Sequence, residues 1–493
     1  MLSNSTKVQN IQKLIPALDQ LYQDYAHKHH FPGYCYGIVV DGSLIHTQCG
    51  GYSELKHQTP VTPQTLFRIA SMTKSFTAMA ILQLRDAGKL KLEDPVYLYV
   101  PEIHHQKLTE DSAEMTIQDL LLHTAGFPTD NPWGDCQLDI SESELIDLMK
   151  QGISFSRATD SSYEYSNLGY ALLGLIIQKI SGVSYQTYVR QNILEPLAMH
   201  QAQWEYTEVP KKNLAHAYRW ENDAWQEESL LHDGYFAAMG GLLVSMEDFS
   251  RYVALHQHAW PPRNAPEQGP LSRASMRAMH QSRIFSDFNS QYTLLDGTPL
   301  GLTKGYGYGL AWSCDIQGKK YVSHAGALPG FGSHWMMMPD YGIAVILFAN
   351  VTYPPTQDVN IQALNTLINK CALKPAMIEP TSIVKMRYQQ LMKLLPDWAA
   401  AQTADLQMSD STIFASNFFL DQALDDRRKE SQGLFAGISP ILEWGTLTPE
   451  NALSASFVVS GKQGSLKIRF GLSPEHSALI QELSIKPILD EQQ

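Results

Sequence analysis

A serine and a lysine three residues apart, Ser71 and Lys74, are the residues of this sequence best suited to covalent chemistry. Residues 65–69 have a strand-like pattern, and apolar residues with helical spacing follow until Gly88 supplies a stop. Ser71 is therefore expected near a helix N-terminus, where unpaired N–H groups favour a developing negative charge. Lys74 lies one turn further on the same face and can take the proton of the hydroxyl.

The Ser-x-x-Lys spacing is a weak signal by itself, because two fixed positions carry little information. It recurs at Ser53/Lys56, in a polar segment, and at Ser382/Lys385, at the start of a late helix. Most such pairs are accidents of helix surfaces. The pair at Ser71 is distinguished by its setting between a strand and a helix.

A second polar cluster is a tyrosine two residues before an asparagine at the mouth of a predicted helix, Tyr165 and Asn167. A phenol near an ammonium can exchange protons with it and act as a base. The amide of Asn167 can hold a lysine or a substrate amide. The simpler alternative is a packed aromatic ring followed by a helix cap.

The third cluster, residues 323–332, is predicted to end one strand and turn into the next. Gly326 would let a ligand approach the strand backbone, and His324 can donate a hydrogen bond to a carboxylate or carbonyl. A strand-terminal histidine before a glycine turn is the simpler alternative. Similar patterns occur at residues 232–234, which do not join two strands, and at residues 462–464.

The surrounding pattern predicts an α/β sandwich in which the Ser71 helix packs on an antiparallel sheet. An opening helix over residues 7–28 precedes a hairpin over residues 34–50, which turns at Asp41-Gly42. Helical patterns dominate residues 90–232 and predict an all-helical insertion, and residues 258–304 read as loop. Strands then return at residues 306–314, 320–324, 333–338 and 342–349, before a helix over residues 357–371.

Prolines around residues 375–380 mark a linker and divide the chain into two predicted domains, residues 1–375 and 376–493. The second has helical patterns at residues 382–395 and 416–434, a hairpin over residues 452–472 and a last strand. It shows no convergent catalytic set. Its predicted role is structural support or association, and substrate gating is the less favoured alternative.

Composition limits the partners. With 44% apolar and 18% charged residues in a chain of 493, a large core is expected, and a net charge of −13 without a basic stripe argues against nucleic acid. The sequence has no run of about eighteen apolar residues, so no membrane span is expected. Five scattered cysteines suggest neither a zinc site nor a disulfide framework, so no metal or cofactor is expected. The sequence predicts a cytoplasmic protein; an exported form is the alternative if a leader precedes Met1.

Taken in order, the three clusters resemble the serine β-lactamase and penicillin-binding-protein superfamily, most closely its class C-like branch. That branch includes D-alanyl-D-alanine carboxypeptidases, D-aminopeptidases and family VIII esterases. The resemblance covers roughly residues 10–372 and rests on the segments 67–74, 116–126, 165–170 and 238–242. It implies a β-lactamase/DD-peptidase-like fold in residues 1–375, with residues 376–493 outside it.

The resemblance also implies roles for these residues. Ser71 would be the acylated nucleophile, Lys74 and Tyr165 the acid/base pair, and Asn167 the residue that positions the lysine and the substrate amide. Which of Lys74 and Tyr165 takes the serine proton is open. The N–H groups of Ser71 and Ala327 would form the oxyanion hole.

One position departs from the family pattern. His324 stands before Gly326 where β-lactamases have the lysine of a Lys-Thr-Gly motif, and histidine is mostly neutral near pH 7. The departure favours a neutral ester or peptide-like substrate over a penicillin carboxylate. The prediction is a serine hydrolase acting through an acyl-enzyme on a small ester, amide or β-lactam-like molecule, as an esterase, D-peptidase or β-lactamase. The alternative is a penicillin-binding or sensor-like protein with little turnover.

Overall fold

The computed structural model describes residues 4–376, 379–399 and 412–488. The chain divides into two compact units, Met1–Pro375 and Ala376–Gln493, and each is considered by itself. Both combine helices with antiparallel sheet, so the mixed fold predicted from the sequence is confirmed. The roles expected of the two units stay predictions.

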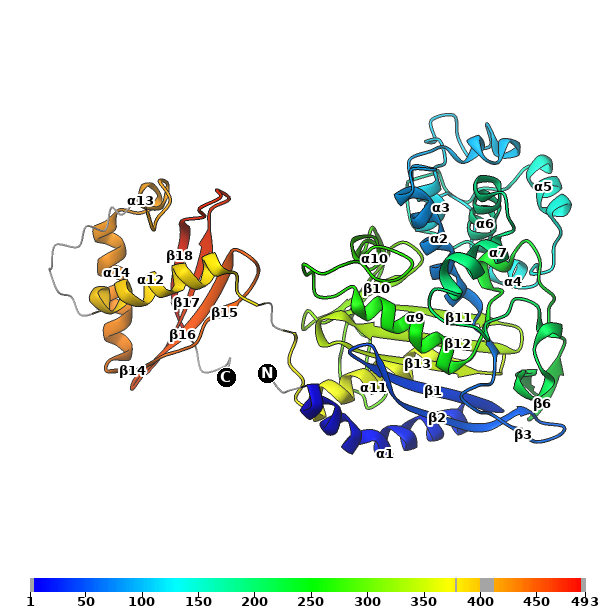
Figure 1. The fold of residues 1–493 in the computed structure, drawn as a ribbon, viewed down its shortest axis with the longest axis horizontal. Coiled ribbons are helices and arrows are strands. Elements are labelled where there is room, and N and C mark those ends of the chain that lie inside the picture. Colours follow the sequence, from blue (N-terminus) through cyan, green and yellow to red (C-terminus); the bar gives the residue numbers. More distant parts are fainter. Residues whose placement is uncertain (1–3, 377–378, 400–411, 489–493) are drawn as a thin grey trace. The chain divides into compact units, whose positions relative to one another are not determined.

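The first unit is built on a nine-stranded antiparallel sheet in the order β3-β2-β1-β13-β12-β11-β10-β9-β8 (Figure 1). The N-terminal strands and the later strands of the unit meet where β1 pairs with β13, from Tyr34 opposite Ala349 to Val40 opposite Ile343. The N-terminal hairpin and the later strands predicted from the sequence thus form one sheet. The strands are β1 (Gly33–Val40), β2 (Ser43–Glu54), β3 (Thr59–Pro60), β8 (Ile284–Asn289), β9 (Leu302–Tyr306), β10 (Ala311–Asp315), β11 (Lys320–Leu328), β12 (Phe331–Met338) and β13 (Ile343–Ala349).

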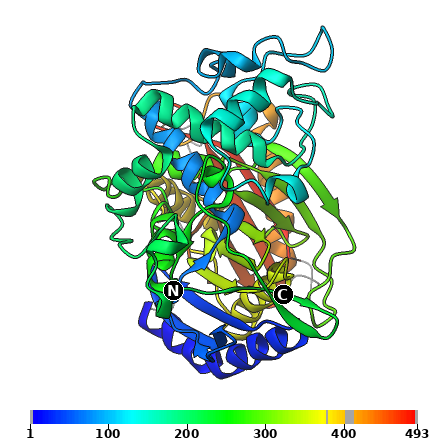
Figure 2. The same cartoon turned by 90° about the vertical axis from the view of Figure 1, so that its right-hand side faces the viewer.

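Helical layers cover both faces of this sheet. Because successive side chains of a strand point to opposite faces, Ile38 joins the core beneath α1 and α11, and Val39 joins the core beneath α2 and α9. Figures 1 and 2 show α1 and α11 on one side and the other helices of the unit on the opposite side. The bounds are α1 (Asn4–Lys28), α2 (Lys74–Asp86), α9 (Met246–His258) and α11 (Thr356–Lys370).

The insertion between α2 and α9 is mainly helical, but it is not entirely so. It contains a hairpin, β5 (Ala217–Glu221) with β6 (Ala224–Glu228), which the helical pattern did not reveal. Two-residue strands β4 (Phe67–Arg68) and β7 (Leu243–Val244) pair with each other near Ser71. The helices here are α3 (Ile117–Leu122), α4 (Asn131–Gly134), α5 (Glu142–Gln151), α6 (Asn167–Ser181), α7 (Tyr185–Val189) and α8 (Ala237–Gly240).

Further sequence-based assignments in this unit are wrong. Residues 306–314 are not one strand: β9 ends at Tyr306 and β10 begins at Ala311, with Gly309 between them at φ +70°. The segment expected to be loop contains a further helix, α10 (Arg273–Met279), and β8, an edge strand of the sheet. Short amphipathic elements in a proline-rich stretch give little periodic signal.

The second unit packs helices on a five-stranded sheet in which β14, β16, β17 and β18 follow one another and β15 pairs with β16. Alternate residues of β16, such as Phe457 and Val459, fill its own core. The elements are α12 (Ser382–Ala399), α13 (Phe418–Asp421), α14 (Leu424–Ile438), β14 (Ile441–Trp444), β15 (Thr448–Pro449), β16 (Ser454–Gly461), β17 (Gly464–Leu472) and β18 (Ile480–Pro487).

Among the described residues, no single helix has both the length and the hydropathy needed to cross a membrane. The segments Asn167–Ser181 and Tyr185–Leu194 reach that level only when combined, and they are bent by 76°.

Candidate active site

The nucleophile candidate lies on a sharp step between β4 and α2. Residues Ala70–Thr73 form a single 3-10 turn that leads directly into α2. Ala70 has φ +49°, a left-handed conformation that is costly for a residue with a side chain. Gly240 lies against this strained residue, and a Cβ there would be 3.4 Å from the carbonyl carbon of Ala70. Packing of α8 against Ala70 thus stabilises the turn that places Ser71 in the cleft.

Lys74 is fully buried and makes three hydrogen bonds. Its Nζ lies 3.0 Å from Ser71 Oγ, 2.7 Å from Asn167 Oδ1 and 2.9 Å from the carbonyl oxygen of Met239. Burial lowers the pKa of Lys74 to about 7, although the carboxylates of Asp135 and Asp130 act to raise it. The amine is therefore partly unprotonated near neutral pH, beside the hydroxyl that it must activate.

Tyr165 completes this group from a distant part of the chain. Its ring centroid is 4.8 Å from Lys74 Nζ, and its phenol interacts with Ser71. Burial raises the pKa of Tyr165 well above its usual value, and the hydrogen bond with Ser71 offsets this only in part. The side chain is a neutral phenol, which can donate a proton and is poorly suited to accept one.

Asn167 is held in place by the loop that carries α4. The carboxylate of Asp130 accepts hydrogen bonds from the backbone N–H groups of Asn167, at 2.7 Å, and Leu168, at 2.9 Å, at the start of α6. Asn167 Nδ2 donates to Asn131 Oδ1 at 3.1 Å. The amide is therefore oriented with its oxygen toward Lys74 and its NH2 toward Asn131.

His324, Gly326 and Ala327 lie inside β11, which continues to Leu328, so the expected strand end at this cluster is wrong. The segment of β11 beyond Ser323 pairs with β12 but lies outside the register with β10. Gly326 also allows close packing of the backbone. A Cβ there would be 2.0 Å from the carbonyl oxygen of Ile69, so the glycine admits the Ser71 segment, and its expected role toward a ligand stays a prediction.

Both ring nitrogens of His324 are used within the protein. Nδ1 is 2.5 Å from the carbonyl oxygen of Ala325, which can only accept, so Nδ1 carries the proton. Nε2 then accepts from the hydroxyl of Tyr306 at 2.9 Å. Burial lowers the pKa of His324 to about 3, and the ring is neutral. It has no N–H left to offer to a substrate carboxylate.

These side chains meet at a cavity of about 390 Å³. Ser71, Tyr165, His324, Gly326 and Ala327 all line it. Lys74 and Asn167 lie behind Ser71, fully buried. Lining residues that the sequence analysis missed are Asn131, Asp135, Tyr163, Lys304, Tyr306, Trp312 and Tyr353. Strands β9 and β10 supply Lys304, Tyr306 and Trp312, and the others come from α4 and from loops. Their segments carry no catalytic motif, although the 128–135 and 285–305 segments are candidates for loops that select the substrate.

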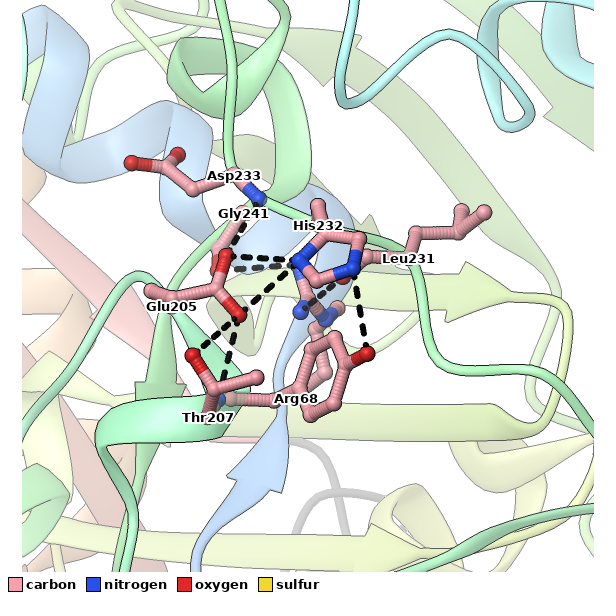
Figure 3. A network of polar contacts seen from close by, with 8 residues as sticks. Arg68, Glu205, Thr207, Leu231, His232, Asp233 and Gly241 are labelled. Atoms are coloured by element: carbon pink, nitrogen blue, oxygen red, sulfur yellow. Dashed lines mark hydrogen bonds and ion pairs between the residues drawn. The ribbon is translucent and has the colours of Figure 1, made fainter.

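A buried arginine supports the strand before Ser71 (Figure 3). Arg68 donates to the carbonyl oxygens of Leu231, at 2.8 Å, and Gly241, at 3.3 Å. Glu205 accepts from the N–H of Asp233 at 3.0 Å and contacts the ring of His232 at 3.1 Å. The His-x-Gly pattern at residues 232–234 thus belongs to a network that braces the Ser71 segment.

Comparison with known proteins places this geometry in a family. A model of the beta-lactamase family matches residues 18–368. The chain belongs to that family. Membership confirms the superfamily resemblance seen in the sequence, and it supports a serine hydrolase that acts on an amide, an ester or a β-lactam.

Curated relatives of this beta-lactamase family member include Protein flp of Staphylococcus aureus, 27% identical over 71% of this chain and 66% of its own length. The chain thus spans slightly less than two thirds of that relative. Penicillin-binding protein 4* of Bacillus subtilis is 26% identical over 68% of this chain and 71% of its own. The octameric penicillin-binding protein homologue from Pyrococcus abyssi aligns with a TM-score of 0.61 and 22% identity, over 96% of this chain and 95% of that one. That similarity shows a shared fold.

Proposed function

We propose that this protein is a serine hydrolase that cleaves an ester or amide through an acyl-enzyme on Ser71. The observation that carries the proposal is the buried, largely desolvated amine of Lys74 at 3.0 Å from Ser71 Oγ. A nucleophilic serine needs a base in contact whose pKa lies near the working pH. Lys74 meets both conditions.

In the proposed mechanism, neutral Lys74 takes the proton of Ser71 while Oγ attacks the substrate carbonyl carbon. The N–H groups of Ser71 and Ala327 would stabilise the oxyanion. The leaving group departs with a proton from the Tyr165 phenol, which Lys74 replaces. Water then attacks the acyl-enzyme ester, gives up a proton to the same relay, and releases the acid and free Ser71.

A neutral ester or peptide-like substrate is proposed ahead of a β-lactam. The lysine that β-lactamases place before this glycine would offer a charge and three donors to a carboxylate. His324 offers neither, since its only N–H is bonded to Ala325. A penicillin-binding protein that acylates without turnover is the competing outcome.

Self-association through the second unit is a further part of the proposal. The Pyrococcus abyssi homologue, described as octameric, aligns with 96% of this chain, which requires that it has a counterpart of the second unit. Mass measurement of the native protein by light scattering tests this. A single monomeric species at micromolar concentration would refute it.

The test of the reaction is Ser71→Ala. Turnover of a chromogenic short-chain ester and of nitrocefin should fall by about 10³-fold or more, because the nucleophile is lost. Covalent labelling by a fluorophosphonate or a penicillin should also disappear. The matched control is Ser286→Ala, a serine that lines the same cavity. Unchanged turnover and labelling in Ser71→Ala would contradict the proposal; labelling of the wild type without turnover would favour the penicillin-binding alternative.

A further inference from the structure

A carboxylate beside the reacting groups has no role in the proposed mechanism. Asp135 is 3% exposed and lines the 390 Å³ cavity together with Ser71. Its Oδ2 accepts from the hydroxyl of Tyr353 at 2.9 Å. Within the described parts of the chain, Oδ1 accepts no hydrogen bond, and no lysine, arginine or histidine nitrogen lies within 4 Å of the carboxylate.

The position of Asp135 relative to the reaction centre is fixed by close packing. It follows α4 directly, and the preceding residue, Gly134, lies against Asn167: a Cβ there would be 2.9 Å from Asn167 Cβ. Asn167 in turn bonds Lys74. Asp135 is therefore the residue after the glycine that contacts Asn167, and the positive charge of Lys74 acts to lower the pKa of its carboxyl.

An unpaired carboxylate that is mostly buried is unfavourable unless something supplies a counter-charge. Burial raises the pKa of Asp135 to about 6, so the group is still ionised at neutral pH. Lys304, a lysine that lines the cavity, is 3.3 Å from Asp287 and is already paired. Tyr163, Tyr353 and Trp312 also line the cavity, and aromatic faces attract cations.

We propose that Asp135 binds a protonated amine on the substrate, close to the carbonyl that Ser71 attacks. The inference rests on the proposed function and narrows it: the substrates are amino-acid esters or amides, or peptides, with a free amine next to the scissile group. Oδ1 accepts the ammonium hydrogen bond, and Tyr353 holds the other oxygen. His324 has no free N–H that could bind a substrate carboxylate in this cavity, which agrees with a site that selects cations.

The test compares alanine p-nitroanilide, of either hand, with its N-acetyl derivative on the full chain. In the wild type, kcat/KM should favour the free amine. In Asp135→Asn the ratio of the two values should fall by about tenfold or more, the loss expected for a charged hydrogen bond. The ratio cancels any general effect on Lys74. In the control Lys304→Met, which removes the opposite charge from the same cavity, the ratio should not fall.

A second measurement separates amine binding from turnover. Calorimetry with Ser71→Ala should show alaninamide binding at least about tenfold more tightly than N-acetylalaninamide, and the added change Asp135→Asn should abolish the difference. If the acetylated substrate turns over with dependence on Ser71 but the ratio is unaffected by Asp135→Asn, the amine inference is overturned and the hydrolase proposal stands. If neither substrate turns over, the calorimetric difference alone decides it, and equal binding overturns it.

Discussion

Lys74 can act as an amine because its ammonium form is costly where the side chain lies. It is fully buried, and its three partners, Ser71, Asn167 and Met239, offer two neutral oxygens and a hydroxyl. No carboxylate of the described residues pairs with it directly, and the negative charges of Asp130 and Asp135 only moderate the effect of burial. Tyr165 is shifted in the opposite sense, toward its protonated form. Two groups whose pKa values are driven apart divide naturally into a base and an acid.

This division predicts the pH dependence of the reaction. Because the pKa of Lys74 is lowered to about 7, the active amine is lost as pH falls below 7. For a neutral ester, kcat/KM should fall about tenfold per pH unit below that point and level off above it. Stopped-time assays between pH 5 and 9 measure this limb.

The companion variant is Tyr165→Phe, which keeps the ring but removes the phenol. We expect a lower rate, by about 10²-fold, with the acidic limb at the same pH, because the limb belongs to Lys74. A limb that vanishes or moves by more than one unit in Tyr165→Phe would instead make the phenol the base.

At the scale of elements, the site depends on how closely β11 approaches the Ser71 segment. Ser333 of β12 donates to the carbonyl oxygen of Ile69 at 2.8 Å, across the face of Gly326. The absence of a side chain at Gly326 lets this contact form. We expect the same contact to fix the position of Ser71 relative to the N–H of Ala327.

Gly326→Ala tests this packing. The new methyl group would overlap the Ile69 carbonyl oxygen at 2.0 Å, so either β11 or the 3-10 turn must shift. Overpacking of this kind costs about 1–3 kcal/mol, and the shift should lower kcat/KM by about tenfold or more. Thermal denaturation and ester kinetics give the two values. Gly169→Ala is the matched control, because its nearest neighbour is at 3.7 Å, an ordinary contact. Equal kinetics for the two variants would show that the close approach does not matter for the reaction.

Elements whose signals are local were predictable. The Asp41-Gly42 hairpin and the opening helix, predicted over residues 7–28, are both present. The β5–β6 hairpin and α10 were missed because they are short and lie in segments with other dominant patterns. The early end assigned to β11 has another cause: Gly326 suggested a turn, whereas its lack of a side chain serves packing.

The motif residues of the candidate site could be predicted from the sequence, but the residues that hold them in place could not. The order of the motifs along the sequence predicts that Ser71, Lys74, Tyr165 and Asn167 share one site. In the structure, Lys74 contacts the other three. Their catalytic roles stay predictions. The left-handed Ala70 and the capping carboxylate of Asp130 depend on tertiary packing, and no local pattern announces either.

At the scale of the molecule, the described residues that line the cavity all come from the first unit. The second unit has a core of its own, built from residues of its helices and sheet. We therefore predict that residues 1–375 expressed alone fold and keep Ser71-dependent ester hydrolysis within about threefold of the full chain, because domains with separate cores fold separately. Circular dichroism and kcat/KM measure this. Loss of activity in a folded fragment would show that the second unit contributes to the reaction.

Acid sensitivity of the whole fold follows from five buried histidines, His123, His256, His280, His324 and His334. Burial lowers the pKa of each, to about 3 for the last three. Since the unfolded chain protonates histidine near pH 6.5, it binds more protons than the folded chain between pH 6.5 and 3. These histidines therefore lower the free energy of unfolding as pH decreases through this window.

Each such histidine should remove up to about 2 kcal/mol between pH 7 and pH 5, enough for five to unfold a domain of ordinary stability. Urea titrations at several pH values measure the slope. In His334→Asn the slope should decrease by one histidine's share, because an amide oxygen can accept the 2.9 Å hydrogen bond that Asn360 Nδ2 donates to His334 Nδ1, without titrating. The control His27→Asn removes an exposed histidine near the end of α1, and its effect on the slope should be smaller. If both variants keep the wild-type slope, the acid loss originates in other groups, with the raised carboxyl pKa of Asp135 excluded because it acts in the opposite direction.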